Sequence, residues 1–417
     1  MYERNLTMHC AQKLTDHIYW IGSNDWSTER FENLFPIPNG VSYNSYFIDD
    51  EKTCIVDSVD DSIRQEFFDN VEHLLNGREL DYLIVNHMEP DHCATLVELL
   101  DRYPNVKMVG NKTTFRFYEQ FYGRPAPDNY YEVKEGDTID LGHHKLHSYT
   151  MPMVHWPEVT CTYESTTGTL FSADAFGTFG TINGNIFADQ LDFDRVYEDE
   201  ARRYYTNIVG KYGAQVQNAL KKASSLNVNI IAPLHGPIWR TPDSISYIIS
   251  KYMHWSTYNA EKKGVVIAFG SMYGNTAEMA QQLAKLLSLR GVTDIRIYDV
   301  SKTNPSYIIS DAWKYSHLVC MAPTYNLGLY LTMENLLHEL YALNFHNHKV
   351  SIVGNHSWAS GAMKRMVDYF TNEFKNMEIV GTPLDIKGAL HDEQLPLFEE
   401  LADSIVASLA ETDIKAL

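Results

Sequence analysis

The sequence predicts a two-domain α/β protein, and its 417 residues are enough for two or three domains, each with its own core. Up to about residue 257, short β-rich runs bounded by turn residues are interrupted by helical spacing, which indicates a mixed α/β domain with many strands. From residue 265, strands and helices alternate strictly, which is typical of a doubly wound parallel sheet. We therefore expect one domain over residues 1–257, a linker over 258–264 and a second domain over 265–417.

The expected elements follow from apolar periodicity. In the first domain, apolar runs predict strands at 41–48, 53–59, 82–86, 107–110, 145–150, 169–172 and 229–232. Helical spacing predicts helices at 63–75, 93–102 and 201–224. In the second domain we expect strands at 265–269, 295–299, 318–321 and 351–354, with a helix at 276–290.

Charge and cysteine content exclude several classes of protein. Lys and Arg number 34 against 54 Asp and Glu, a net charge of -20 that repels nucleic acid and anionic membrane surfaces. The first twenty residues lack the apolar core of a leader peptide, and no run of about 18 apolar residues follows. We expect a soluble, cytoplasmic protein. The five cysteines never show CxxC spacing, so we expect buried thiols rather than disulfides or a cysteine metal site.

A cluster of metal-ligand residue types follows the expected strand at 82–86. His87, Glu89, Asp91 and His92 crowd the turn between this strand and the next helix. At this chain's composition, His-x-acid-x-acid-His is expected by chance only about 0.01 times. The alternative is a solvated acidic turn in which Asp91 caps the helix.

Three further candidates stand after later strands. They are His155 in Met-Pro-Met-Val-His-Trp-Pro-Glu, Asp174 in Phe-Ser-Ala-Asp-Ala-Phe-Gly, and His235 in Pro-Leu-His-Gly-Pro-Ile-Trp-Arg. Taken singly, a histidine beside tryptophan is an ordinary core residue and an Asp before Ala-Phe-Gly an ordinary turn residue. Because each follows an apolar strand and opens into Gly or Pro, we expect these side chains to converge on one rim.

These motifs resemble the metallo-β-lactamase superfamily, which implies an N-terminal αββα sandwich. Hydrolytic zinc members typically show His-x-His-x-Asp-His, whereas this chain has Glu89 at the third position; the hard carboxylate shifts the preference from zinc towards iron or manganese. The full pattern resembles the flavodiiron protein family. That resemblance implies that His87, Glu89, His155 and Asp174 hold one iron, and that Asp91, His92, Asp174 and His235 hold the other, with Asp174 bridging both.

A phosphate-binding loop is expected after the first strand of the second domain. The strand at 265–269 runs into Gly-Ser-Met-Tyr-Gly-Asn-Thr, whose backbone N–H groups and hydroxyls at a helix N-terminus suit a phosphate. The loop lacks the GK[ST] of a P-loop and the GxGxxG of a dinucleotide site. The alternative is a capped surface helix.

Two later strand ends support the ligand site, and this half resembles flavodoxin. The resemblance implies a flavodoxin-like doubly wound parallel sheet that binds FMN through three loops. The first loop comprises Ser271, Met272, Tyr273, Gly274, Asn275 and Thr276, the second Pro323, Thr324, Tyr325 and Asn326, and the third Asn355, His356, Ser357, Trp358, Ala359, Ser360 and Gly361.

The resemblance to flavodiiron proteins covers nearly the whole chain. It implies two irons, FMN, and reduction of O2 to water, of NO to N2O, or of both, as protection against oxygen or nitrosative stress. Because no rubredoxin or reductase segment follows Leu417, we expect an external electron donor, such as rubredoxin or a flavin or rubredoxin reductase. A head-to-tail homodimer, or a dimer of dimers, is expected. The alternatives are a zinc-dependent hydrolase fused to a flavodoxin-like module, and a non-enzymatic diiron and flavin gas sensor.

Overall fold

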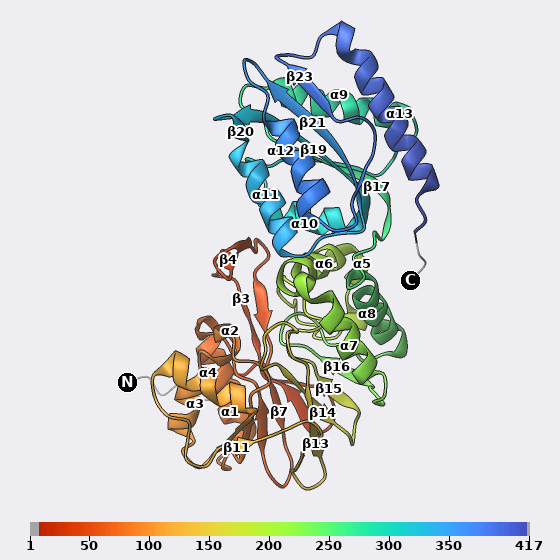
Figure 1. Cartoon of the computed structure of the whole chain (residues 1–417). Helices are drawn as coiled ribbons and strands as arrows, with labels where there is room; N and C mark the ends of the chain where they lie inside the picture. Colours follow the sequence, from red (N-terminus) through yellow and green to blue (C-terminus); the bar gives the residue numbers. More distant parts are fainter. Residues whose placement is uncertain (1–7, 415–417) are drawn as a thin grey trace. The chain divides into compact units, whose positions relative to one another are not determined.

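The computed structural model describes residues 8–414. Backbone contacts divide them into two compact units (Figure 1). The first comprises the described residues up to Tyr205 together with Ala214–Tyr252, and the second comprises Thr206–Gly213 and the chain from Met253 onwards. Residues 1–7, on which the expected lack of a leader peptide partly depends, lie outside the described residues.

Two sheets form the centre of the first unit. One has the strand order β1-β2-β7-β8-β9-β10-β11 and the other the order β12-β13-β14-β15-β16. The strands of the first sheet are β1 (Gln12–Lys13), β2 (Ile18–Trp20), β7 (Tyr46–Ile48), β8 (Cys54–Val56), β9 (Tyr82–Ile84), β10 (Lys107–Gly110) and β11 (Tyr131–Glu132). Those of the second are β12 (Thr138–Asp140), β13 (Lys145–Thr150), β14 (Thr160–Glu164), β15 (Thr169–Phe171) and β16 (Ile230–Ala232).

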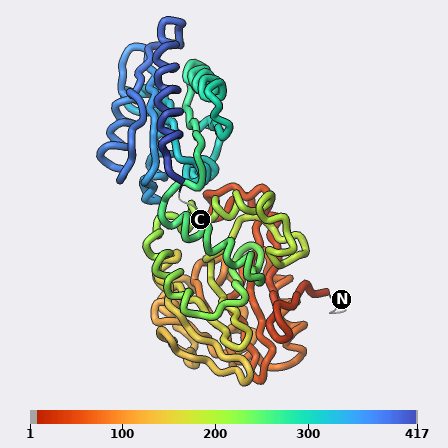
Figure 2. Tube along the Cα trace, turned by 90° about the vertical axis from the view of Figure 1, so that its right-hand side faces the viewer, coloured from red at the N-terminus to blue at the C-terminus, as the bar shows by residue number. Residues whose placement is uncertain are grey.

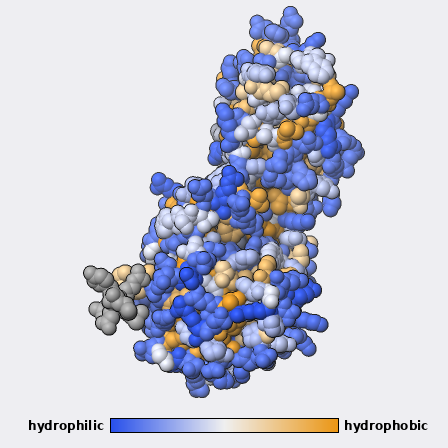
Figure 3. Space-filling view, turned by 90° about the vertical axis from the view of Figure 1, so that its left-hand side faces the viewer, coloured by the Kyte–Doolittle hydropathy of each residue, from blue (hydrophilic) through white to orange (hydrophobic). Residues whose placement is uncertain are grey.

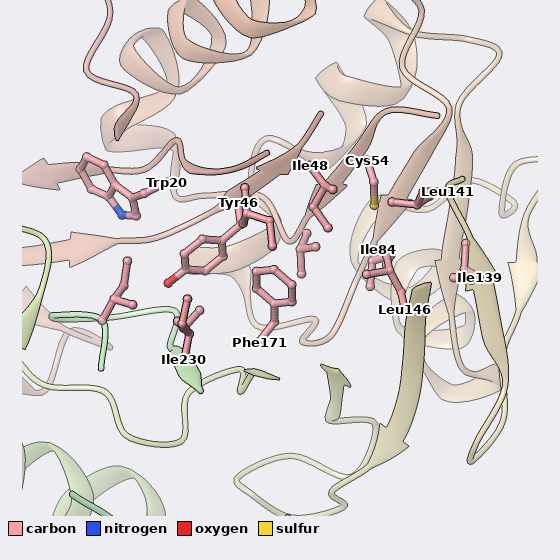
Figure 4. Packing of buried hydrophobic residues seen from close by; sticks show 14 of the residues in the cluster. Trp20, Tyr46, Ile48, Cys54, Ile84, Ile139, Leu141, Leu146, Phe171 and Ile230 are labelled. Atoms are coloured by element: carbon pink, nitrogen blue, oxygen red, sulfur yellow. The ribbon is translucent and has the colours of Figure 1, made fainter. Parts of the chain in front are cut away.

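The core of this unit lies between the two sheets. Ile48 and Cys54 of the first sheet, and Ile139, Leu146 and Phe171 of the second, belong to one buried cluster (Figure 4). Burial of this apolar surface from both sheets stabilises the sandwich at about 25 cal/mol per Å² of apolar area removed from water.

Helices cover the outer faces of the sandwich (Figure 1). On one side lie α1 (Arg64–Leu75), α2 (Pro90–Cys93), α3 (Leu96–Arg102) and α4 (Lys112–Tyr122); the remaining helices of the unit are α5 (Phe193–Val196), α6 (Glu198–Tyr204), α7 (Gly213–Ala223) and α8 (Pro242–Trp255). Leu170 of β15 lines one apolar cavity with Val216 of α7 and Tyr252 of α8, which shows that these two helices pack on the second sheet. The layers are therefore those of the predicted αββα sandwich.

The expected strand at 41–48 is two strands. β6 (Val41–Tyr43) pairs with β3 (Ser23–Asp25), whereas β7 pairs with β2 and β8. Between them, the buried Asn44 side chain donates to the carbonyls of Pro233 (2.8 Å) and Gly236 (2.9 Å). These long-range bonds turn the chain from one pairing to the other. A second short hairpin, β4 (Arg30–Phe31) with β5 (Phe35–Pro36), precedes them.

The expected helices at 93–102 and 201–224 are also interrupted. Residues 90–102 form α2 and α3, and α6 is followed by a π-helical turn (Tyr205–Val209), a 3-10 turn (Gly210–Tyr212) and α7. A Cβ at Gly213 would lie 2.4 Å from the Ser256 carbonyl, so the backbone approaches another segment closely there. Gly210, in the 3-10 turn, and Gly213, at the start of α7, also favour the interruption of the helix, because glycine is a poor helix former.

The second unit is a parallel sheet with the strand order β18-β17-β19-β21-β22; β23 also pairs in parallel with β21, and β20 pairs antiparallel with β19. Counted along the chain this is the order 2-1-3-4-5 of the flavodoxin-like doubly wound fold. The strands are β17 (Lys262–Phe269), β18 (Ile295–Asp299), β19 (Tyr315–Tyr325), β20 (Gly328–Leu329), β21 (Lys349–His356), β22 (Glu378–Ile379) and β23 (Leu384–Lys387).

Helices lie on both faces of this sheet (Figure 2). α9 (Asn275–Leu289) and α13 (Leu395–Glu411) share one core cluster with the sheet, and α10 (Pro305–Lys314), α11 (Leu331–Ala342) and α12 (Ala362–Asp368) contact its strands outside that cluster. The predicted doubly wound sheet is confirmed.

The surface agrees with the composition. The face seen in Figure 3 is mostly polar, with scattered apolar residues. All five cysteines are free thiols and four are buried, but Cys10 is exposed, so the expectation of burial was wrong for that residue. Among residues 8–414, none of the helices has both the length and the apolar character needed to cross a membrane.

Candidate metal centre and flavin site

Strand ends place the seven candidate ligands on one edge of the first unit. His87, Glu89, Asp91 and His92 follow β9, while His155, Asp174 and His235 follow β13, β15 and β16. β13 and β15 both run antiparallel to β14, and β15 runs parallel to β16, so these three strands deliver their following loops to the same edge. Asn86 fixes the start of the first loop, because its backbone N–H and side-chain amide both donate to Asp57, at 2.6 and 2.9 Å.

Four of the side chains form one donor group. Nε2 of His155 lies 3.0 Å from Oε2 of Glu89 and 3.1 Å from Oδ2 of Asp174. Nε2 of His87 lies 3.2 Å from the same Glu89 oxygen and 3.3 Å from the same Asp174 oxygen. Ligand atoms about 2.1 Å from one ion lie about 3 Å apart, so these four atoms have the spacing of a coordination shell.

The other three side chains form a second group beside the first. Nε2 of His92 lies 3.4 Å from Oδ2 of Asp91 and 3.0 Å from Oδ1 of Asp174. Nε2 of His235 lies 3.3 Å from Oδ2 of Asp91 and 3.7 Å from Oδ1 of Asp174. Asp174 therefore presents one carboxylate oxygen to each group, which is the arrangement that a bridging ligand requires.

Unsatisfied buried atoms show that these residues fit metal ions. Among the described residues, both carboxylate oxygens of Asp91, both ring nitrogens of His92, Oδ1 of Asp174 and Nε2 of His235 are buried without a hydrogen-bond partner. A buried polar atom left without a partner costs about 1–3 kcal/mol, whereas a coordinated cation satisfies it. Three carboxylates and four imidazoles together suit iron or manganese.

Electrostatics favour a cation in both groups. Burial alone would lower the pKa of His92, but the carboxylates of Asp91 and Asp174 raise it to about 9. Burial also opposes the shift of His155, whose hydrogen bonds to Asp174 and Glu89 raise its pKa to about 9. The pKa of the buried Glu89 lies below its usual range because His155 and His87 outweigh desolvation. Glu89 is thus ionised at neutral pH and can balance part of the charge of a bound ion.

Three supporting residues were not predicted. Nδ1 of His87 lies 2.7 Å from Oε1 of Glu158, and Nδ1 of His235 lies 2.9 Å from the carbonyl of Ser42. Such contacts fix the tautomer of a metal-bound histidine. Glu158 is the last residue of the Met-Pro-Met-Val-His-Trp-Pro-Glu motif around His155, so the carboxylate in that motif could have indicated a supporting residue. The third is Glu32 in the β4–β5 hairpin, where desolvation and the charge of Glu89 raise the pKa of its carboxyl group to about 8.

The first segment predicted to bind FMN follows β17, whereas the second begins within the last residues of β19 and the third within those of β21; all three lie at the carboxyl edge of the parallel sheet. Strand order reverses between β17 and β19, and doubly wound folds bind ligands at this point. α9 begins after Gly274, which has φ 100° and provides no side-chain cap, so the first N–H groups of the helix are left for a phosphate.

The side chains of these loops divide into two kinds. Tyr273 and Trp358 are 93% and 81% exposed, and Tyr325 is 38% exposed, so their aromatic faces are open to a flavin ring. Others hold the loops: Thr324 Oγ1 accepts from the backbone of Gly361 (3.0 Å), and the Asn355 amide donates to the Ile386 carbonyl (2.9 Å). The remaining predicted loop residues lie in the same three segments.

Family models match both halves of the chain. A model described as ODP family beta lactamase matches residues 41–236, and a flavodoxin model matches residues 267–400. The anaerobic nitric oxide reductase flavorubredoxin of Klebsiella pneumoniae is 30% identical over 361 residues, which cover 84% of this chain and 73% of that protein. The chain belongs to the flavodiiron protein family.

Solved structures of flavodiiron proteins agree with this assignment. The rubredoxin oxygen:oxidoreductase of Desulfovibrio gigas aligns with a TM-score of 0.89 at 25% identity, over 96% of this chain and 98% of that one. The flavodiiron protein of Giardia intestinalis aligns with the same TM-score and identity, over 96% and 97%. The chain is therefore an oxidoreductase of the flavodiiron type, with FMN and a diiron centre as its cofactors.

Proposed function

We propose that this flavodiiron protein reduces O2 to water, NO to N2O, or both, at two irons held by the two donor groups. His87, Glu89, His155 and Asp174 hold one iron, and Asp91, His92, Asp174 and His235 hold the other. The observation that carries the proposal is Asp174, whose Oδ2 lies 3.1 Å from His155 Nε2 while its Oδ1 lies 3.0 Å from His92 Nε2. A pair of redox-active ions beside each other suits the reduction of a small diatomic gas, because both ions can contribute electrons.

The protein residues position and tune this pair. Asp174 sets the separation of the ions, while Glu158 and the Ser42 carbonyl hold His87 and His235 in one orientation. The raised pKa of Glu32, about 8, favours its protonated form at neutral pH, so it adds little negative charge beside Glu89. When bound, the irons supply the positions that hold O2 or NO and the redox change that reduces them.

The second unit binds the electron carrier. Residues 271–276 would hold the phosphate, and Tyr325 and Trp358 would contact the flavin ring. Bound FMN supplies the exchange between a donor and one-electron acceptors. The names of two relatives, flavorubredoxin and rubredoxin oxygen:oxidoreductase, support a rubredoxin-type donor, or a flavin or rubredoxin reductase acting with it.

We further propose a head-to-tail homodimer, or a dimer of dimers, in which the FMN of one subunit serves the irons of its partner. The protein would act in the cytoplasm against oxygen or nitrosative stress. Mixing an Asp174→Ala subunit with a Gly274→Val subunit tests the pairing. Activity restored by the mixture supports transfer between subunits; two inactive variants that form mixed dimers without recovery would exclude it.

The reaction is tested by electrode measurements of O2 and NO consumption on one reduced preparation with excess donor. Sustained rates above about 1 s⁻¹ with either gas establish an enzyme rather than a sensor. Metal analysis of protein grown with both iron and zinc should find two irons per chain. Stoichiometric zinc with thioester or lactam hydrolysis would instead establish a hydrolase and overturn the proposal.

A further inference from the structure

A second group of histidines lies at the edge of the first unit opposite to the diiron donors. His17, Asp49, Asp50, His143 and His144 line one surface cavity of about 280 Å³. Asp49 and Asp50 precede β8, whereas the parallel strands β8 and β9 lead at their other ends towards Asp57 and His87. The cavity is therefore separate from the diiron site.

Both sheets of the sandwich contribute to this cavity. His17 precedes β2 and Asp50 lies in the β7–β8 turn of the first sheet, whereas His143 and His144 lie in the β12–β13 turn of the second. The Asp50 carboxylate accepts from the backbone N–H groups of His143 (3.2 Å) and His144 (2.6 Å), which joins the two turns. The core beneath them, drawn in Figure 4, includes Ile48 and Leu141. The backbone that carries these histidines is therefore held in place by the Asp50 hydrogen bonds and the packed core.

His144 carries two buried nitrogens without a hydrogen-bond partner. The residue is 1% exposed, and neither its Nδ1 nor its Nε2 has a hydrogen-bond partner within residues 8–414. Its Nδ1 lies 3.2 Å from Oε1 of Glu164. Glu164 is held by the backbone N–H groups of Thr166 (2.6 Å) and Thr167 (2.8 Å).

Glu164 orients His144 for a ligand at Nε2. The two threonine N–H groups keep the Glu164 carboxylate beside Nδ1 of His144. An ionised carboxylate favours the proton on Nδ1 and leaves the lone pair on Nε2. In the diiron centre, Glu158 lies on the Nδ1 side of His87 at a shorter distance, 2.7 Å, and is hydrogen-bonded to it. A carboxylate behind a histidine is the usual support of a metal ligand.

The spacing of the three imidazoles also suits one ion. Ring centroids lie 5.0 Å apart for His143 and His144, 5.8 Å for His17 and His144, and 6.4 Å for His17 and His143. In the diiron donor set, the two histidine rings assigned to the same iron lie 5.2 Å apart in one group and 4.6 Å apart in the other. Three imidazoles bound at about 2.1 Å place their centroids about 5 Å apart. His17 and His143 are exposed, and their side chains would have to turn towards His144 for all three to bind one ion.

We propose that His17, His143 and His144 bind one divalent transition-metal ion of the imidazole-preferring class, of which Zn²⁺ is the probe, with Glu164 positioning His144. Borderline ions such as Zn²⁺ prefer imidazole to oxygen ligands, and three histidines leave one position for water. Asp49 and Asp50 add negative charge at the cavity, although Asp49 also pairs with Arg78 at 2.6 Å. The bound ion joins the two sheets at this edge and stabilises the sandwich.

The test uses the iron-loaded, FMN-containing protein dialysed against Zn²⁺ at pH 7.5, with zinc and iron both counted. We expect one zinc per chain with the iron content unchanged. His17→Gln and His143→Gln, both at exposed positions, should each weaken zinc binding at least tenfold, and Glu164→Gln should weaken it 10- to 100-fold. His338→Gln, at an exposed histidine of α11, is the matched control and should bind like the unmodified protein.

A second measurement separates a specific site from surface binding. Zinc at 100 times its dissociation constant should raise the thermal midpoint of the first unit by roughly 5 °C, and this rise should vanish in the His17→Gln, His143→Gln double variant. Gas consumption should be the same in that variant, so failure here is distinguishable from failure of the proposed function. Zinc uptake that displaces iron, or that is equal in all variants, would overturn the proposal.

Discussion

Glu158→Gln tests whether a buried carboxylate tunes the metal centre through His87. Glu158 is fully buried, and its Oε1 accepts from His87 Nδ1 at 2.7 Å and from the backbone N–H of Met88 at 2.9 Å. Glutamine has the same shape and keeps one acceptor oxygen, so the substitution removes the negative charge while leaving the packing in place.

The size of the effect follows from this contact. A hydrogen bond to a charged group stabilises by about 1.5–3 kcal/mol and a neutral one by about 0.5–1.5, so the loss is on the order of 1 kcal/mol. That corresponds to about a tenfold change in an equilibrium constant, at the lower end of the 10- to 100-fold loss of metal affinity typical of such supporting residues. We therefore expect the iron next to His87 to bind 10- to 100-fold more weakly.

Competition with a coloured iron chelator measures this loss. In Glu158→Gln, one of the two irons should leave at a lower chelator concentration than in the unmodified protein. Glu135→Gln is the control, because Glu135 is a solvent-accessible carboxylate of the same unit, paired with Lys222 at 3.0 Å. Equal iron retention by both variants would refute the reasoning that Glu158 supports His87 as a ligand.

Three further predictions concern the other parts of the molecule. Asp174→Ala should lose iron and gas consumption while keeping the flavin absorbance; an active variant would remove Asp174 from the cluster. Trp358→Ala should weaken FMN binding about tenfold, measured by fluorescence titration, because one stacking surface is lost, whereas Trp26→Ala, at a residue 70% exposed in the first unit, should not. Burial and the nearby charge of Lys349 lower the pKa of His317 to about 3 in the folded protein. In the unfolded chain the same histidine has a pKa of about 6.5 and takes up a proton first, so the free energy of unfolding decreases as the pH drops below about 6.5. Between pH 6.5 and 5 this amounts to about 2 kcal/mol, and the denaturation midpoint of His317→Gln should depend less on pH over that range; an identical dependence would show that His317 is not the group responsible.

Local patterns predicted much of the fold because they are set by neighbouring residues. The strands at 107–110 and 145–150 have the predicted bounds, since apolar runs between turn residues leave few alternatives. The prediction of one strand at 41–48 was wrong, because hydrogen bonds from Asn44 to Pro233 and Gly236 redirect the chain there. These hydrogen-bond partners lie about 190 positions away in the sequence, so no local pattern could have indicated them.

The sequence by itself determined the order of two α/β units, the strand ends that carry the candidate ligands, and the chemistry of those ligands, because residue type and periodicity are local properties. Only the tertiary structure decided that Asp174 faces both donor groups, that Glu158 stands behind His87, and that His17 and His144 meet across two sheets. Each of these depends on distances between segments far apart in the chain, and such distances are fixed by sheet pairing and core packing rather than by any stretch of sequence.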